Sequence, residues 1–312
     1  MPVNYNKPPK TFDEQLDLLI SRGMQIADRE KAIHSLSHIN YYRLEAYWLP
    51  FETSRQPHQF FANTHIDTVI NHYLFDRELR LLLLDAIERI EVSFRTQWAY
   101  HISHAYGSHG YLDNNKSLRK NERQLVKDTN ELKAHINRSD EKFIAHFCHT
   151  YYDDLPPVWV SCEVMSLGLL SRFYSNLRAY RVRRAIAATY QLDEGFLEGF
   201  LEHLSYVRNV CAHHSRLWNR HLTKKMPLPK NKPTGLKENI YIDDENKTEH
   251  KIYNTLVVIQ HILSIICPDS HWAQQLESLI KKYPIDIKRM GFPVEWKTLP
   301  LWHKQWQPAF TP

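Results

Sequence analysis

A chain of 312 residues is long enough for one large domain or two small ones, and its 43% of hydrophobic residues can fill a core. No pair of its four cysteines has C-x-x-C spacing, which argues against a zinc ribbon and a redox dithiol, and the formal charge of +5 permits an anionic partner such as RNA without requiring one. The N-terminal residues are polar, and the longest apolar stretch, 256–267, is too short to span a bilayer. We therefore expect a cytoplasmic protein with no membrane association.

The first part of the chain has the pattern of short helices followed by one long helix. Thr11 and Glu14 have the spacing of a capping box, which predicts a helix start. A second short helix is predicted over 28–39, and an aromatic-rich segment over 39–51 follows it. Apolar residues then recur every three or four positions over 66–105, which predicts a single helix of about 60 Å.

The remainder has the pattern of shorter helices separated by two polar stretches. Residues 116–138 are polar and charged, which predicts a solvated helix or a mobile arm. Residues 223–250 combine lysines, prolines and an acidic run, which predicts a long loop with room for a short hairpin. The other predicted helices are 139–150, 160–177, a basic helix that includes Arg178 to Arg184, a long amphipathic helix capped by Asp193, 251–266 and 270–282.

These patterns together predict an all-α fold. Only 8 glycines stand against 16 prolines, and runs with the two-residue alternation of strands are few. We expect an N-terminal helical segment over 1–60, a helical core over 61–222, and a loop with a C-terminal helical extension over 223–312.

The strongest candidate for chemistry is Arg208 with His213, four residues between them, in the run RNVCAHHSRLWNR (208–220). RNA cleavage without a metal needs an imidazole to move protons and a fixed cation to stabilise the charged phosphate. On a regular helix Arg208 and His213 lie about 140° apart, whereas Asn209 shares a face with His213 and can hold its ring. The spacing also occurs by chance elsewhere, so a polar helix end with a surface arginine remains the alternative.

The same run resembles the R-N-x-x-A-H-H-x-R-L-W-N-R signature of the Abi family (AbiD/AbiF type) of phage abortive-infection proteins, which is similar to a branch of the HEPN superfamily. Three more segments resemble other blocks of that family in the same order: the aromatic block INYYRLEAYWLPF (39–51), the central helix (75–102) and the Pro-Trp…Gly block (156–177). The resemblance spans about residues 12–222, and residues 223–312 match no motif.

The resemblance implies an HEPN-type helical bundle and a metal-independent endoribonuclease that leaves 2′,3′-cyclic phosphate and 5′-hydroxyl ends. Arg208, Asn209 and His213 would be its catalytic residues, with no cofactor. Related HEPN nucleases pair two such motifs across an interface, so a homodimer is expected. A small antitoxin RNA is a second expected partner. The alternative is a non-catalytic helical module that binds RNA or a protein.

Glu91 and Arg95 on the predicted long helix are candidates for a supporting role, as is His214 beside the motif. HEPN folds often place a polar residue of a central helix next to the helix that carries the Arg-His motif. Glu91 and Arg95 also have the i, i+4 spacing of a simple ion pair within a helix, which is the structural alternative.

Basic and aromatic residues outside the motif suggest where RNA could bind. Arginines and lysines can contact phosphates, and the aromatic cluster Tyr41–Trp48 can either stack bases or fill the core. The predicted RNA-binding arginines are Arg178, Arg181, Arg183, Arg184, Arg216 and Arg220, and nearby lysines at 224, 225, 230 and 232 add positive charge.

Histidine pairs at 34/38, 101/104 and 146/149 each lack a third ligand at motif spacing. We therefore expect no metal site, and a metal-dependent hydrolase has no motif to support it.

Overall fold

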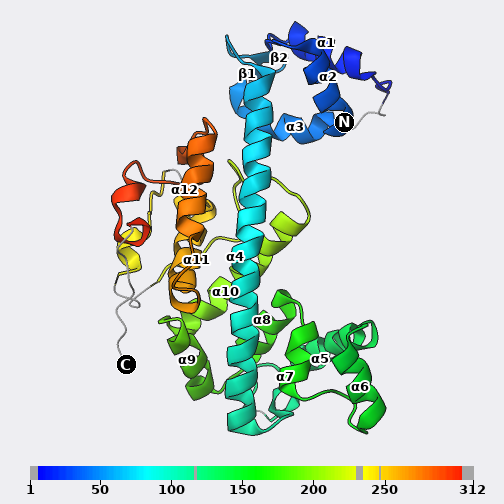
Figure 1. Cartoon of the computed structure of the whole chain (residues 1–312), viewed down its shortest axis with the longest axis vertical. Helices are drawn as coiled ribbons and strands as arrows, with labels where there is room; N and C mark the ends of the chain where they lie inside the picture. Colours follow the sequence, from blue (N-terminus) through cyan, green and yellow to red (C-terminus); the bar gives the residue numbers. More distant parts are fainter. Residues whose placement is uncertain (1–5, 116–117, 230–234, 246, 304–312) are drawn as a thin grey trace. The chain divides into compact units, whose positions relative to one another are not determined.

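The computed structural model describes residues 6–115, 118–229, 235–245 and 247–303 (Figure 1). These residues form helices and one two-stranded hairpin, which confirms the predicted all-α fold. The helices are α1 (Phe12–Ser21), α2 (Arg29–His38), α3 (Tyr41–Trp48), α4 (Ile66–Tyr106), α5 (Glu122–Asn137), α6 (Lys142–Thr150), α7 (Val158–Val164), α8 (Leu167–Asn176), α9 (Tyr180–Thr189), α10 (Glu194–Ala212), α11 (Tyr253–Ile266) and α12 (Trp272–Lys282), and the hairpin strands are β1 (Glu52–Arg55) and β2 (His58–Phe60).

The chain divides into two compact units, and α4 and α12 contribute residues to both. The first unit comprises residues 1–79 with 277–285, and the second comprises residues 80–276 with 286–312. Within the described ranges, no helix has the length and apolar character needed to cross a membrane.

The first unit contains α1 to α3, the hairpin and the first turns of α4. The predicted cap of α1 is confirmed, because Thr11 Oγ1 accepts from the Glu14 amide at 3.2 Å and Glu14 Oε2 accepts from the Thr11 amide at 2.7 Å. Tyr47 of α3 donates its hydroxyl to the buried carboxylate of Asp76 on α4 at 2.7 Å, which ties these two helices together. The hairpin was not predicted, because strands of four and three residues are too short for alternation to be visible in the sequence.

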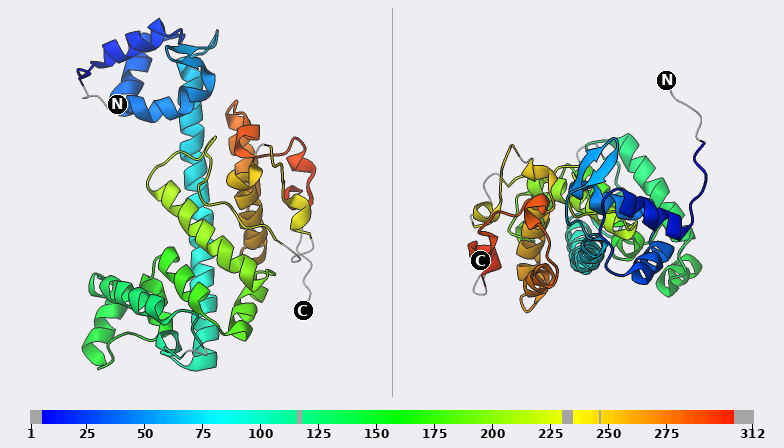
Figure 2. Two further views of the ribbon diagram at one scale, coloured as in Figure 1. Left: turned by 180° about the vertical axis from the view of Figure 1, so that it is seen from behind. Right: turned by 90° about the horizontal axis from the view of Figure 1, so that it is seen from above.

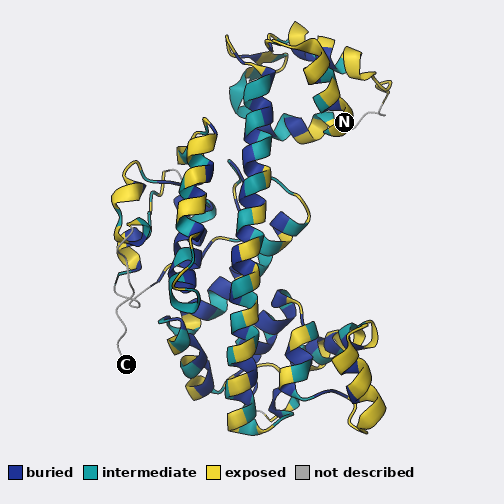
Figure 3. Cartoon of the chain, in the orientation of Figure 1, coloured by how far each residue is buried: buried dark blue, intermediate teal, exposed yellow. Residues whose placement is uncertain are grey.

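In the second unit α4 is the central helix, close to its predicted span. Its buried face, which includes Leu83, Ile90, Phe94 and Trp98, follows the apolar spacing of the sequence. The views of Figures 1 and 2 show α10 crossing α4, and α8 packs against α10. In Figure 3 the buried surfaces of these helices face the interior of the unit.

Residues 122–137 form a helix, α5, which is one of the two predicted alternatives for this segment, but the helix is not simply solvated, because one of its faces packs on α8. Leu125, Leu132 and Ile136 recur on one face of α5 and are buried there. The buried carboxylate of Asp128 accepts from Arg172 Nε of α8 at 2.6 Å. Apolar residues at helical spacing thus outweigh the polar composition of this segment. Residues 116 and 117 lie outside the described ranges.

The predicted helix over 160–177 is two helices, because a turn at Met165 and Ser166 separates α7 from α8. The Ser166 hydroxyl accepts from the Leu169 amide at 3.2 Å and so caps α8 as a separate helix. This turn leaves the Met165 carbonyl available to accept a hydrogen bond from the Arg95 side chain of α4.

The segment 223–250 is a long loop, as predicted, but its described residues contain no hairpin. Its ends are held by backbone bonds from Leu222 to His250 at 2.8 Å and from Met226 to Glu249 at 3.1 Å. Single 3-10 turns at 237–239 and 248–250 interrupt it. Lys230 and Lys232 lie outside the described residues.

Candidate functional site

The helix that carries the Arg-His motif is held firmly by its apolar face. The buried residues of α10 recur along one side of the helix, which packs against α8 and α9 and so fixes its position. They are Phe196, Leu197, Phe200, Leu201, His203, Leu204, Val207, Val210 and Cys211. Asp193 is the residue before the helix, as predicted, but its side chain makes no capping bond.

The motif ends in a left-handed turn at His214. His213 is the last residue with nearly helical backbone angles, and His214 has φ of 56°. The amides of His214 and Ser215 turn back to the carbonyls of Cys211 at 3.0 Å and Val210 at 2.9 Å, which is a Schellman motif. Glycine usually occupies this position, so a histidine there is a strained choice of the kind that concentrates at functional sites.

The exposed side of this helix end carries Asn209, His213 and His214, while Arg208 is half-buried. Arg208 Nη1 donates to Asn209 Oδ1 at 3.3 Å. The Asn209 side-chain oxygen therefore accepts from Arg208, and the expected hold of Asn209 on the His213 ring is not seen. The Asn209 main-chain carbonyl accepts from the His213 amide at 3.0 Å as an ordinary helical bond.

Arg95 of α4 has three acceptors. Its Nη2 donates to Glu91 Oε1 at 2.6 Å and to the Met165 carbonyl at 2.8 Å, and its Nη1 lies 3.5 Å from Glu163 Oε2. The Glu91 and Arg95 side chains are only 13% and 17% exposed, so this is more than a solvated surface pair. Arg95 thus joins α4 to the turn between α7 and α8.

Two neighbouring hollows bring Arg208 together with Glu91 and Arg95. The larger, of about 670 Å³, is also lined by His135 and Arg138 of α5 and by Glu163. The smaller, of about 340 Å³, has Arg208, Glu91 and Arg95 on its wall together with apolar residues of α4: Leu84, Ile87 and Val92. The two predicted groups, on α4 and on α10, therefore meet at one place, whereas His213 and Asn209 line neither hollow.

Sequence reasoning missed His135 and Arg138 because it treated their segment as a solvated helix or a mobile arm, with no face packed on the core. The only signal for them was the apolar spacing of Leu125, Leu132 and Ile136, which places α5 against the core.

The predicted RNA-binding arginines at 178–184, in α9 and just before it, do not form one group. Arg178, Arg181 and Arg184 are exposed, but Arg183 is 8% exposed and pairs with Glu198 of α10. Its guanidinium carbon lies 5.4 Å from the centre of the Tyr174 ring, and its Nη2 donates to the Glu194 carbonyl at 3.4 Å. Arg183 is thus a buried packing residue that joins α8, α9 and α10, and we correct its assignment as an RNA contact.

Arg216 and Arg220, also predicted to bind RNA, are half-buried and bound to the backbone that follows α10. Arg216 Nη1 donates to the Trp218 carbonyl at 2.6 Å, and Arg220 Nη1 donates to the Arg216 carbonyl at 3.2 Å. Both side chains shape the turn after the motif.

A family model described as Abi-like protein matches residues 34–219, a range that contains α3 to α10 and the whole Arg-His motif. Neither the curated proteins nor the solved structures contain a significant match to the chain. The matched range covers more than half of the sequence. The chain therefore belongs to the family of Abi-like proteins, which indicates a role in abortive infection.

Proposed function

We propose that this protein is a metal-independent endoribonuclease of the HEPN type, similar to AbiD and AbiF proteins, that cleaves RNA during abortive infection. The observation that carries the proposal is the position of Arg208. It comes from the motif on α10 and lines two hollows with Glu91 and Arg95 of α4. His213 and His214 are exposed at the strained end of the same helix.

In the proposed reaction the 2′-oxygen of a ribose attacks the adjacent phosphorus while the bond to the 5′-oxygen breaks. The His213 imidazole takes the proton of the 2′-hydroxyl and, as the imidazolium, returns a proton to the leaving 5′-oxygen, so that it ends the step neutral. The Arg208 guanidinium stabilises the charge that builds up on the phosphate oxygens. The products are a 2′,3′-cyclic phosphate and a 5′-hydroxyl, and no metal ion takes part.

The rival function is a helical module that binds RNA without cutting it. Buried motif side chains with no hollow beside them would favour that module. Instead, Asn209 and His213 are exposed and Arg208 borders a hollow, which supports the enzyme. The test is incubation of the purified protein with total cellular RNA, with and without EDTA, followed by mapping of the new ends.

We also propose that two chains assemble as a homodimer around the motif. One chain supplies one Arg-His set, and dimeric sites of this kind have two-fold symmetry. Val92 of α4 is 47% exposed and lies on the wall of the smaller hollow with Arg208 and the apolar Leu84 and Ile87. Apolar side chains at that place support a second copy as the covering partner.

A regulatory RNA is the further partner we propose, because a ribonuclease of this kind must be silent in an uninfected cell. Arg178, Arg181 and Arg184 are exposed and can contact its phosphates, with Lys225 of the following loop. A discrete small RNA should co-purify at low salt and be visible on a gel of the extracted nucleic acid. The triple change of these arginines to glutamate should release it, and protein free of nucleic acid at low salt would contradict the proposal.

A further inference from the structure

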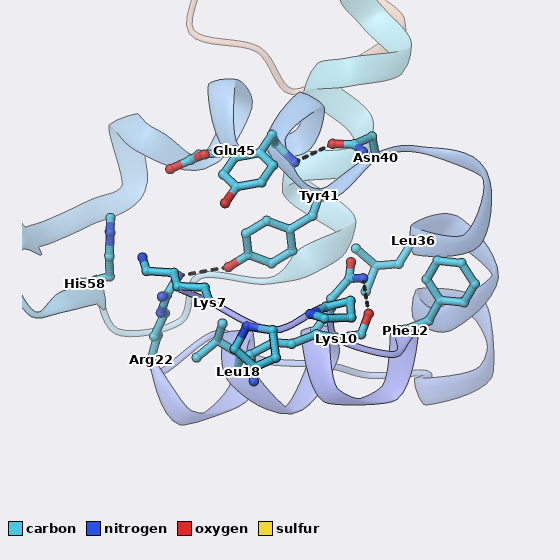
Figure 4. Close-up of a pocket in the computed structure, with 14 residues that line it drawn as sticks. Lys7, Lys10, Phe12, Leu18, Arg22, Leu36, Asn40, Tyr41, Glu45 and His58 are labelled. Carbon is cyan, nitrogen blue, oxygen red and sulfur yellow. Dashed lines mark hydrogen bonds between the residues drawn. The ribbon is translucent and has the colours of Figure 1, made fainter. Parts of the chain in front are cut away.

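The first unit contains a pocket of about 520 Å³ that the proposed cleavage reaction does not use (Figure 4). Its walls come from the segment before α1, from α1 to α3 and from the hairpin. Its volume is within the range of about 300–1,000 Å³ that is usual for small-ligand sites. The pocket is therefore large enough for a ligand with one ring system and a charged group.

Positive charge predominates in this pocket. Lys7, Lys10 and Arg22 line it with one carboxylate, that of Glu45, and the fourth basic residue, His58, already contacts Glu52 at 3.1 Å. Among the described residues, Lys7, Lys10 and Arg22 have no carboxylate partner within 4.0 Å, although Arg22 Nη1 donates to the Tyr41 hydroxyl at 2.9 Å. Three cations with no salt-bridge carboxylate among the described residues, although Lys10 lies close enough to Glu14 to act on its charge, suit an anionic ligand.

Aromatic rings accompany these cations. Tyr42 is 68% exposed and Phe12 is 44% exposed, although large apolar rings are usually covered. Behind them the Tyr41 ring is held by Arg22 and by edge-to-face packing on Trp48 at 4.9 Å. Asn40 Oδ1 accepts from the Tyr42 amide at 2.9 Å and fixes the backbone there (Figure 4). The Tyr41 ring and the backbone at Tyr42, next to the exposed rings, are therefore held in place.

We propose that this pocket binds an unpaired nucleotide of a single-stranded RNA, with its base stacked on Tyr42 and its phosphate held by Lys7, Lys10 and Arg22. Exposed rings beside lysine and arginine are how proteins hold single strands without reading their sequence. The identity of the partner as RNA rests on the proposed function. An acidic peptide would use the cations alone and would have no need of the Tyr42 ring.

The test uses the full chain and a 2′-O-methyl oligouridine of eight nucleotides with one 4-thiouridine. This probe lacks the 2′-hydroxyl that the proposed reaction needs, so its binding does not depend on cleavage. Irradiation should attach it to peptides between Lys7 and His58. The Tyr42→Ala variant should bind about tenfold more weakly, because it removes one base–aromatic stack. Tyr42→Phe should bind as the natural chain does.

Two controls make the outcome decisive. Tyr152→Ala removes a fully exposed tyrosine of the second unit and should leave binding unchanged. The pair Lys7→Gln and Lys10→Gln should flatten the salt dependence of binding, whereas Lys127→Gln, which changes an exposed lysine of α5 in the second unit, should not. The proposal would be overturned if the probe crosslinks only outside residues 7–58. It would also be overturned if Tyr42→Ala binds the probe as tightly as the natural chain and polyglutamate displaces the probe completely. Cleavage of unmodified RNA is measured in a separate assay. Failure of the proposed binding site and failure of the proposed ribonuclease activity can therefore be told apart.

Discussion

At the scale of single residues, Arg95 and Arg208 line the same hollows but differ in what holds them. Arg95 binds Glu91, Glu163 and the Met165 carbonyl, so removing it leaves half-buried polar groups unpaired. Arg208 Nη1 donates to Oδ1 of its neighbour Asn209 at 3.3 Å. Arg95 therefore has a structural role, and Arg208 is available to a substrate.

This difference predicts opposite effects of two alanine variants. Arg95→Ala should lower the free energy of unfolding by about 1–3 kcal/mol, whereas Arg208→Ala should change it by less than about 0.5 kcal/mol. Urea unfolding followed by circular dichroism measures both. Arg138→Ala, which removes an exposed arginine of the larger hollow, is the matched control and should behave like Arg208→Ala. A larger loss of stability in Arg208→Ala than in Arg95→Ala would contradict these roles.

The motif residues were predictable because a run of thirteen residues, 208–220, carries them together. The burial of Arg183 was not, because it depends on partners that the fold brings from elsewhere. Glu198 and Tyr174 are fifteen and nine residues away in the chain, on α10 and α8. A cluster of arginines in a sequence therefore does not show which of them are exposed on the surface and which are buried between helices.

At the scale of elements, buried histidines join α10 and α11 to their neighbours. His203 Nδ1 lies 3.0 Å from the Lys224 carbonyl and must carry the proton there, so its Nε2 accepts from the Thr255 hydroxyl at 2.8 Å. His261 Nε2 donates to the Tyr190 carbonyl at 3.0 Å. Burial lowers the pKa of both His203 and His261 to about 4.

These histidines predict that the fold weakens in mild acid. Their pKa in the unfolded chain is about 6.5, so between about 6.5 and 4 the unfolded state binds more protons than the folded state. Stability is therefore complete above about pH 6.5 and falls as the pH drops, by up to about 1.4 kcal/mol per pH unit for each histidine.

Urea unfolding between pH 7.5 and 5.5 measures this slope while most carboxylates stay ionised. His203→Gln should be less stable at neutral pH and should show a shallower slope. The exposed His149 gives a matched control, because His149→Gln should keep the full slope. A stability that is constant or rises on acidification would show that these imidazoles are not held neutral.

The helices of the core were predictable because each carries its own apolar spacing. The span of α4 is one residue longer than predicted, and the capping residues of α1 are those expected. The hairpin was not predictable in this way, because its strands of four and three residues are too short to show alternation. The apolar spacing of α5 indicates its buried face but not the helix that covers it, which depends on contacts such as the bond from Arg172 to Asp128 across 44 positions.

At the scale of the whole molecule, residues 277–285 belong to the same unit as residues 1–79. Lys282 and Tyr283 both contact Glu78 Oε1 at 2.7 Å. No local pattern reveals such a long-range association.

The proposed dimer predicts a matched pair of results. Val92→Glu places a charge on an exposed position beside Arg208 and should give a monomer with much weaker cleavage. Val126→Glu changes a similarly exposed valine of α5, 54% against 47% accessible, and should remain dimeric and active. Light scattering at micromolar concentration reports the mass. A natural chain that is active as a monomer would exclude the dimeric site.

RNA cleavage by the purified protein with and without EDTA, and with His213→Ala and Arg208→Ala, tests the central claim most directly. Cleavage should survive EDTA and leave 2′,3′-cyclic phosphate and 5′-hydroxyl ends. It should fall by about 10²–10⁴-fold in His213→Ala, the usual effect of losing a general acid–base group, and should also fall sharply in Arg208→Ala. Cleavage that EDTA abolishes and His213→Ala retains would contradict the account.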